Sequence, residues 1–182
     1  MTLSGNVTGT IPFVAVRSSQ GGRTEVRQNS SGSGQDVFRC FVDAAIFPSS
    51  GVVSFGSVII NEVGSFHAAV NGWIQCVPDP VLAEAMACRE ALIWVKENGI
   101  QDVELLSDCS SVVEALRDGS FQVRSYLGSL LEDCKTILGG FHSFKISRVP
   151  RDANCIAHTL ARRANSQPCS WLSSPQTLFL IF

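Results

Sequence analysis

The spacing of hydrophobic positions divides the chain into two regions. Between residues 37 and 77, turn residues at 48–51 and 61–64 separate three runs rich in β-branched and aromatic residues: VFRCFVDAAI, VVSFGSVII and SFHAAVNGWIQCV. Short runs of this composition, bounded by Gly, Asn and Pro, are typical of strands joined by tight turns. We therefore expect an antiparallel meander of three strands.

From residue 81 onward the hydrophobic period becomes that of a helix. Apolar residues recur at 81, 85, 88, 92 and 95, and the following Asn-Gly pair is a typical helix end. The pattern then predicts a strand at 103–108, helices at 109–119 and 124–138, a strand formed by FHSFKISRV and a last helix formed by ANCIAHTLARRAN. The order βββαβααβα predicts an α/β fold, a mixed sheet with helices on its faces.

Composition divides the 182 residues into three parts. Residues 1–36 are rich in Ser, Gly, Thr and Gln and cannot bury enough apolar surface to offset the entropy of ordering, so we expect a flexible leader. Residues 37–166 are expected to form one domain, and residues 167–182 a C-terminal tail. Three arginines give the leader a weak transit-peptide pattern, although a plain disordered leader fits the composition better.

The seven cysteines narrow the class of protein. They are odd in number and widely spread, unlike a zinc site or a secreted disulfide framework, and most lie in apolar runs such as those around Cys40 and Cys88. We expect buried thiols, no disulfide-linked partner, a monomer and an intracellular location, nuclear or cytoplasmic. No apolar run approaches the ~20 residues of a membrane span, so we expect no membrane partner.

Three acidic residues lie where the pattern predicts buried positions or the end of a strand. Asp43 interrupts an otherwise apolar strand, and Glu84 shares a helical face with apolar residues. Asp108 ends a predicted strand immediately before a helix, at the end of a sheet where ligand sites often form. Three converging carboxylates are stable mainly when divalent cations neutralise them. The three acids are therefore a candidate metal centre.

Each acid also has a purely structural interpretation. Asp108 could be the N-cap of the helix that follows it, and Glu84 could stabilise the positive end of its own helix. Asp43 could close an edge strand and be solvated. The structural interpretation is favoured for Asp108 and Glu84 taken singly, whereas the three acids together, in this order of elements, favour the functional one.

Five segments together resemble the type-1 ribonuclease H domain: RCFVDAA, GSVIINEVGSF, AEAMACREAL, ELLSDCSSVVEAL and VPRDANCIAHTLARRA. They follow the family's order and spacing, and they are most similar to the version found in plant retroelement-derived proteins. The resemblance implies the ribonuclease H-like fold, a five-stranded mixed sheet with flanking helices. This fold agrees with the order of elements predicted from the hydrophobic period.

The resemblance also implies roles for the acids. Asp43 matches the first-strand catalytic aspartate, Glu84 the first-helix glutamate and Asp108 the aspartate after the fourth strand. Their implied role is to hold two Mg²⁺ ions, one of which activates a water while the other stabilises the leaving 3′-oxygen during attack on an RNA phosphodiester. Mn²⁺ is an alternative metal. The implied substrate is the RNA strand of an RNA–DNA hybrid.

The chain departs from the family at the fourth acid. Where the motif NxxADxLA has its aspartate, this chain has His158, in the segment NCIAHTLA. Imidazole carries no negative charge and is a poor Mg²⁺ ligand, although it suits Mn²⁺ or Zn²⁺ better. His158 is therefore a fourth candidate catalytic residue that could shuttle a proton near neutral pH, or a hydrogen-bonding residue that supports the last helix.

A basic region around the last helix could contact phosphates. Asn154, His158 and Arg162 have the i, i+4, i+8 spacing of one helical face, and Arg151 lies just before it. We expect Asn154, Arg151 and Arg162 to bind substrate. The alternative is a solvated helix end whose arginines complement the helix dipole. Because the net charge is -2 at pH 7, affinity for nucleic acid should be modest and salt-sensitive.

These observations favour a metal-dependent endonuclease that cleaves the RNA strand of hybrids and recognises backbone shape and 2′-hydroxyls. One alternative is a catalytically weakened module that keeps the fold and binds nucleic acid. Another is a pure interaction domain in a larger assembly. Trp73 could stack on bases or pack in the core, whereas Trp94 is expected in the core.

Overall fold

The computed structural model describes residues 37–118, 125–164 and 169–172. The strands are β1 (Phe38–Phe47), β2 (Val52–Ile60), β3 (Phe66–Ile74), β4 (Asp102–Ser107), β5 (Ser143–Arg148) and β6 (Cys169–Leu172). The helices are α1 (Pro80–Glu97), α2 (Ser110–Arg117), α3 (Tyr126–Leu138) and α4 (Cys155–Arg163), the last preceded by a 3₁₀ turn, η1 (Arg151–Asn154). The predicted order βββαβααβα is confirmed, with each element within a few residues of its expected position.

The strands form one mixed sheet in the order β5-β4-β1-β2-β3-β6. Neighbours from β1 to β3 are antiparallel, whereas β4 pairs with β1, and β5 with β4, in parallel. The predicted five-stranded mixed sheet is thus present, with β1 at its centre. Because β1 lies within the sheet and helices pack on both of its faces, a polar side chain on β1 can be shielded from solvent.

The strand β6 lies in the segment that the sequence analysis treated as a tail. It pairs antiparallel with Ala68–Asn71 of β3. The sheet therefore extends past residue 166, the expected end of the domain. A strand of four residues adds to a sheet through backbone hydrogen bonds and leaves too short a hydrophobic pattern to be recognised.

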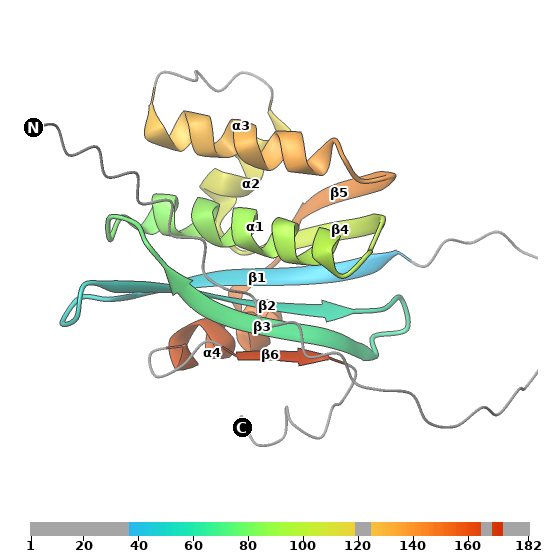
Figure 1. The fold of residues 1–182 in the computed structure, drawn as a ribbon, viewed down its shortest axis with the longest axis horizontal. Coiled ribbons are helices and arrows are strands. Elements are labelled where there is room, and N and C mark those ends of the chain that lie inside the picture. Colours follow the sequence, from blue (N-terminus) through green and yellow to red (C-terminus); the bar gives the residue numbers. More distant parts are fainter. Residues whose placement is uncertain (1–36, 119–124, 165–168, 173–182) are drawn as a thin grey trace, which may run out of the picture. The chain divides into compact units, whose positions relative to one another are not determined.

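Helices cover both faces of the sheet. α1 packs on β1 and β2 with α2 and α3 beside it, and α4 packs on the opposite face against β1, β2 and β3 (Figure 1). The main core lies on the α1 side and includes fully buried Ile59, Leu92 and Leu105. Cys40 and Cys88 belong to this core, as their apolar surroundings predicted.

Local signals set the ends of α1. The side chain of Asp79 accepts a hydrogen bond of 2.8 Å from the backbone N–H of Leu82, and Pro80 occupies the first helical position. The helix stops before Gly99, whose φ of +75° suits glycine. These ends determine where Glu84, in the second turn, meets the sheet.

α4 lies so close to the sheet that β2 needs a glycine beneath it. A Cβ on Gly56 would fall 2.6 Å from the Cβ of Leu160 and would also collide with the backbone of Ala157 and Ala161. Small residues on the buried side of α4 complete this close approach. The helix therefore has little freedom to slide along the sheet.

Polar side chains of β2 and β3 also hold α4 by its last carbonyls. Ser54 donates to the carbonyl of Ala161 at 2.6 Å, and Asn71 donates to that of Leu160 at 2.9 Å. The indole N–H of Trp73 donates to the carbonyl of Ala164. The backbone N–H of Ala164 also donates to the carbonyls of Leu160 and Ala161 at the end of the helix. The bonds from β2 and β3 add to this cap and determine the position of α4 along the sheet.

We predict that Gly56→Ala destabilises the protein by about 1–3 kcal/mol or more, because the added methyl group overpacks the interface between α4 and β2. Urea denaturation of the full chain would measure this. The matched control is Gly139→Ala, whose Cβ would make only ordinary contacts, the nearest at 3.5 Å. Equal urea midpoints for the two variants would contradict the proposed close packing.

Candidate active site

The register of the sheet brings Asp43 and Asp108 together. Phe41 of β1 pairs with Leu106 of β4, and two further residues along each parallel strand lead to Asp43 and Asp108. Because side chains alternate along a strand, both acids lie on the face that α4 covers. β4 ends at Ser107, so Asp43 has no β4 residue paired beside it.

Asp43 is not a solvated edge residue, because it lies on the central strand and is only 4% exposed. Asp108 is not the N-cap of α2 either: Cys109 occupies that position, and no side chain caps the helix. The structure thus excludes the two structural interpretations that the sequence left open for these residues. Both carboxylates instead contact residues of η1 and α4.

Glu84 reaches the same place from the other side of the sheet. Its carboxyl group lies within hydrogen-bonding contact of Asp43 and near the backbone of Ala44. One of its oxygens, Oε2, is buried and has no hydrogen-bond partner. The first turn of α1 holds no acidic residue, and Glu84 lies in the second turn, so it is not placed to stabilise the positive end of its own helix.

Asn154 holds Asp108 in place. Its amide nitrogen donates to Oδ1 of Asp108 at 2.8 Å and to the carbonyl of Val42 at 2.9 Å. It therefore connects the end of β4 with β1. Asn154 is only 1% exposed, so its side chain positions Asp108 and does not form the substrate-facing surface expected from the sequence.

His158 is the partner of Asp43. Its Nδ1 shares a hydrogen bond of 2.6 Å with Oδ2 of Asp43, and its side chain is 30% exposed. The structure shows this hydrogen bond, and a role of His158 in proton transfer stays a prediction. Asp43 thus contacts both Glu84 and His158, and Asp108 joins this group through Asn154 and through its charge.

The electrostatics of the group are unfavourable for three ionised acids. Burial raises the pKa of the Asp43 carboxyl; the hydrogen bond with His158 opposes this rise, and the charge of Asp108 adds to it. Burial likewise raises the pKa of Glu84, from an ordinary value of 4.5 to about 9, and the charges of Asp43 and Asp108 contribute. The cluster therefore retains a proton unless a cation replaces it.

Two observations fit a hard divalent cation at these residues. The available donors are carboxylate oxygens, which Mg²⁺ and Mn²⁺ prefer, and Oε2 of Glu84 is unpartnered. Within the described residues, however, no three Cys, His, Asp or Glu side chains already stand together as a metal-binding group. Ion binding would therefore require side-chain movement by Asp43, Glu84 or Asp108.

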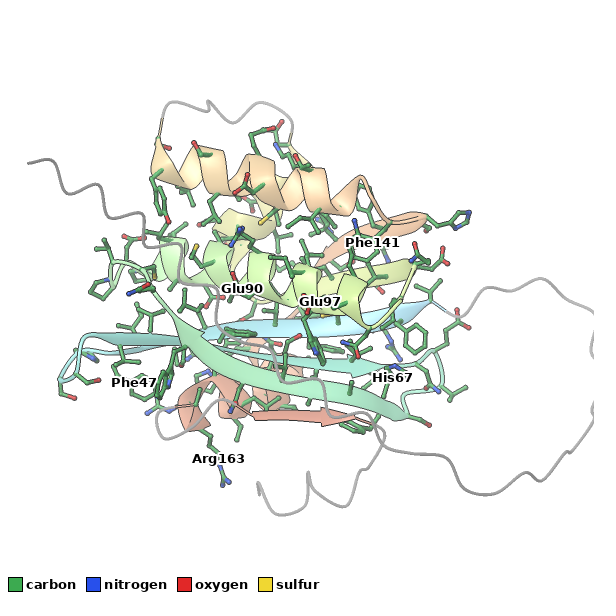
Figure 2. All side chains as sticks on the ribbon, viewed as in Figure 1. Phe47, His67, Glu90, Glu97, Phe141 and Arg163 are labelled. Atoms are coloured by element: carbon green, nitrogen blue, oxygen red, sulfur yellow. The ribbon has the colours of Figure 1, made fainter. Side chains whose placement is uncertain are left out.

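The arginines expected to bind substrate lie on the surface around this group. Arg151 in η1 and Arg162 on α4 are exposed, and neither makes an ion pair within the described residues. Arg163, also on α4, points away from the sheet (Figure 2). These side chains are free to contact phosphates.

The tryptophans have separate roles. Trp94 is 3% exposed and lies in the core, as expected. Trp73 is 47% exposed and donates its indole N–H to the carbonyl of Ala164, so it supports α4. The hydrophobic pattern alone does not reveal that Ser54, Asn71 and Trp73 position α4. The signal for Ser54 and Asn71 is a polar residue within an otherwise apolar strand.

A family model described as reverse transcriptase-like matches residues 41–164. Among curated proteins, none matches the chain. Among solved structures, ribonuclease H1 of the halophilic archaeon Halobacterium salinarum NRC-1 is similar at 26% identity and a TM-score of 0.64, over 70% of this chain and 96% of that one.

Two further structures show the same fold. The N-terminal ribonuclease H domain of a Mycobacterium tuberculosis protein has 22% identity and a TM-score of 0.63, over 71% of this chain and 94% of that one. A ribonuclease H1 isolated from compost was solved with an RNA/DNA hybrid. It has 20% identity and a TM-score of 0.61, over 70% of this chain and 95% of that one. The match of the family model covers well over half of the chain, and the sheet has the order and directions expected of this fold. The chain therefore belongs to the reverse transcriptase-like family, within the ribonuclease H-like superfamily, and has the fold of type-1 ribonuclease H domains.

Proposed function

We propose that this protein binds RNA–DNA hybrids and hydrolyses their RNA strand in a reaction that depends on a divalent metal. The observation that carries this proposal is the convergence of Asp43, Glu84 and Asp108 at the centre of the sheet, with one buried carboxylate oxygen unpartnered. The similarity to an archaeal ribonuclease H1 at 26% identity supports the choice of reaction.

The three acids would hold the metal, as Mg²⁺ or Mn²⁺. A bound divalent cation supplies Lewis acidity toward phosphate oxygens and makes water more acidic. The chain itself fixes the ligands: Asn154 holds one oxygen of Asp108, and His158 holds one oxygen of Asp43. The two-ion arrangement implied by the family resemblance would need a further ligand at position 158, where this chain has an imidazole.

Substrate binding would depend on the backbone of the hybrid. Arg151 and Arg162 are exposed and are placed to contact phosphates, which supply most sequence-independent affinity. Hybrid geometry and the 2′-hydroxyls of the RNA strand would provide selectivity. Because the chain carries a net charge of -2, affinity for the hybrid should be modest and should fall steeply with salt.

Among the described residues, none of the helices has the length and apolar composition of a membrane span.

A second candidate function is binding of nucleic acid without cleavage. The bond between His158 and Asp43 favours it, because an imidazole without negative charge stands at the position of the fourth acid. Hybrid binding would then persist in the absence of turnover. The two functions share the surface and differ in the chemistry at Asp43.

We predict that Asp43→Asn lowers cleavage of a labelled RNA–DNA hybrid by at least about 100-fold, since several kcal/mol of charge stabilisation at the metal would be lost. Cleavage would be measured with Mg²⁺ and with Mn²⁺. The control is Asp133→Asn, on the exposed side of α3, which should leave the rate unchanged. Unchanged cleavage by Asp43→Asn would contradict the nuclease proposal.

We predict that His158→Asp raises Mg²⁺-dependent cleavage by on the order of 10-fold or more, because it restores a carboxylate that Mg²⁺ prefers to imidazole. The same assay would compare this variant with the wild type over a range of Mg²⁺ concentrations. If the rate does not increase, the missing acid does not limit the reaction.

We predict that metal-free protein loses stability between pH 4.5 and 9 because of Glu84. In this window the unfolded carboxyl is ionised while the folded one keeps its proton, so each pH unit costs up to about 1.4 kcal/mol. Glu84→Gln should remove this loss and should be more stable than the wild type at about pH 8 in a chelator. The two proteins should have similar stability near pH 4.

Mg²⁺ should reverse the difference in stability between the wild type and Glu84→Gln, because the ion favours the ionised carboxylate of Glu84. It should raise the melting temperature of the wild type at about pH 8 more than that of Glu84→Gln. Thermal melts with and without Mg²⁺ would measure both effects. A Glu84→Gln variant that is less stable than the wild type in chelator at this pH would contradict the proposed burial of a protonated Glu84.

A further inference from the structure

The neighbours of Asp43 differ in what they offer a cation. Glu84 has a buried oxygen without a hydrogen-bond partner, and Asp108 has only one of its two oxygens bonded, to Asn154, within the described residues. His158, by contrast, is bonded directly to Asp43. Glu84 and Asp108 therefore present free oxygen ligands, whereas His158 does not.

The bond to His158 engages Oδ2 of Asp43. Nδ1 and Oδ2 are 2.6 Å apart, which leaves no room for an ion between them. An ion held by Asp43 and residue 158 would have to break this bond in a site where Asp43 is 4% exposed. It would gain in exchange only the other nitrogen of an imidazole, a poor ligand for a hard cation.

Charge shows why the residue at position 158 matters for a second ion. The three acids carry at most three negative charges, so two divalent cations would leave positive charge uncompensated in a mostly buried site, where such charge is costly. A carboxylate at position 158 would supply the missing negative charge and two oxygen ligands.

We infer that this chain binds a single divalent cation, between Asp43, Glu84 and Asp108, and that His158 excludes a second one by holding Asp43. The inference rests on the metal site of the proposed function and specifies how many ions that site binds. It makes His158 a positioning residue for Asp43. It also implies that the second ion would return when the imidazole is replaced by a carboxylate.

The test counts bound Mn²⁺ on the full chain without nucleic acid, from the electron paramagnetic resonance signal of the free ion during a titration. The wild type should bind one Mn²⁺ per chain, and His158→Asp should bind two. The matched control is His142→Asp. His142 also bonds an aspartate through Nδ1, Asp102 at 2.8 Å, but lies away from the three acids. This variant should still bind one ion.

Two ions on the wild type would overturn the inference, as would one ion on a folded His158→Asp or a second ion on His142→Asp. If His158→Asp does not fold, the count on the wild type still decides, since two ions or none would contradict a single-ion site. Cleavage is a separate measurement. A wild type that binds one ion but cleaves no hybrid would contradict the proposed function and would support this inference.

Discussion

The packing of α4 against the sheet is the constraint on which the site depends. Gly56 allows the helix to approach, and Ser54, Asn71 and Trp73 hold its last carbonyls. With the helix fixed in this way, Asn154 at its start meets Asp108, and His158 meets Asp43. Without this packing the acids of β1 and β4 would lose the partners that orient them. The geometry of the candidate site is thus a consequence of how one short helix crosses three strands.

The site combines this rigid support with unfavourable electrostatics. Burial and mutual repulsion raise the pKa values of Asp43 and Glu84, so the free protein holds a proton where a cation would otherwise be. Perturbed carboxylates of this kind are typical of functional sites, and the cost of keeping them is offset by packing elsewhere. His158 relieves part of the repulsion through its bond with Asp43. It does so at the position where the family resemblance implies an acid, and this substitution distinguishes the chain from the family pattern.

Much of this arrangement could be predicted from the sequence. The periods of 2 and 3.6 residues gave five strands and four helices, and acids within apolar patterns identified Asp43 and Glu84. The role of Asn154 could not be predicted. A helical wheel placed it with Arg162, but Asn154 lies in the 3₁₀ turn η1 and is buried by its bonds to Val42 and Asp108, whereas Arg162 is exposed. The bonds from Ser54, Asn71 and Trp73 to α4 join segments about a hundred residues apart, and β6 is too short to leave a pattern.

The most direct test of the account is a crystal structure of the full chain grown with Mn²⁺, with anomalous diffraction used to locate the metal. The account predicts one anomalous peak, bounded by the carboxylates of Asp43, Glu84 and Asp108, while the bond between His158 and Asp43 stays intact. A structure with no peak at these acids, or with a peak between Asp43 and His158, would contradict it.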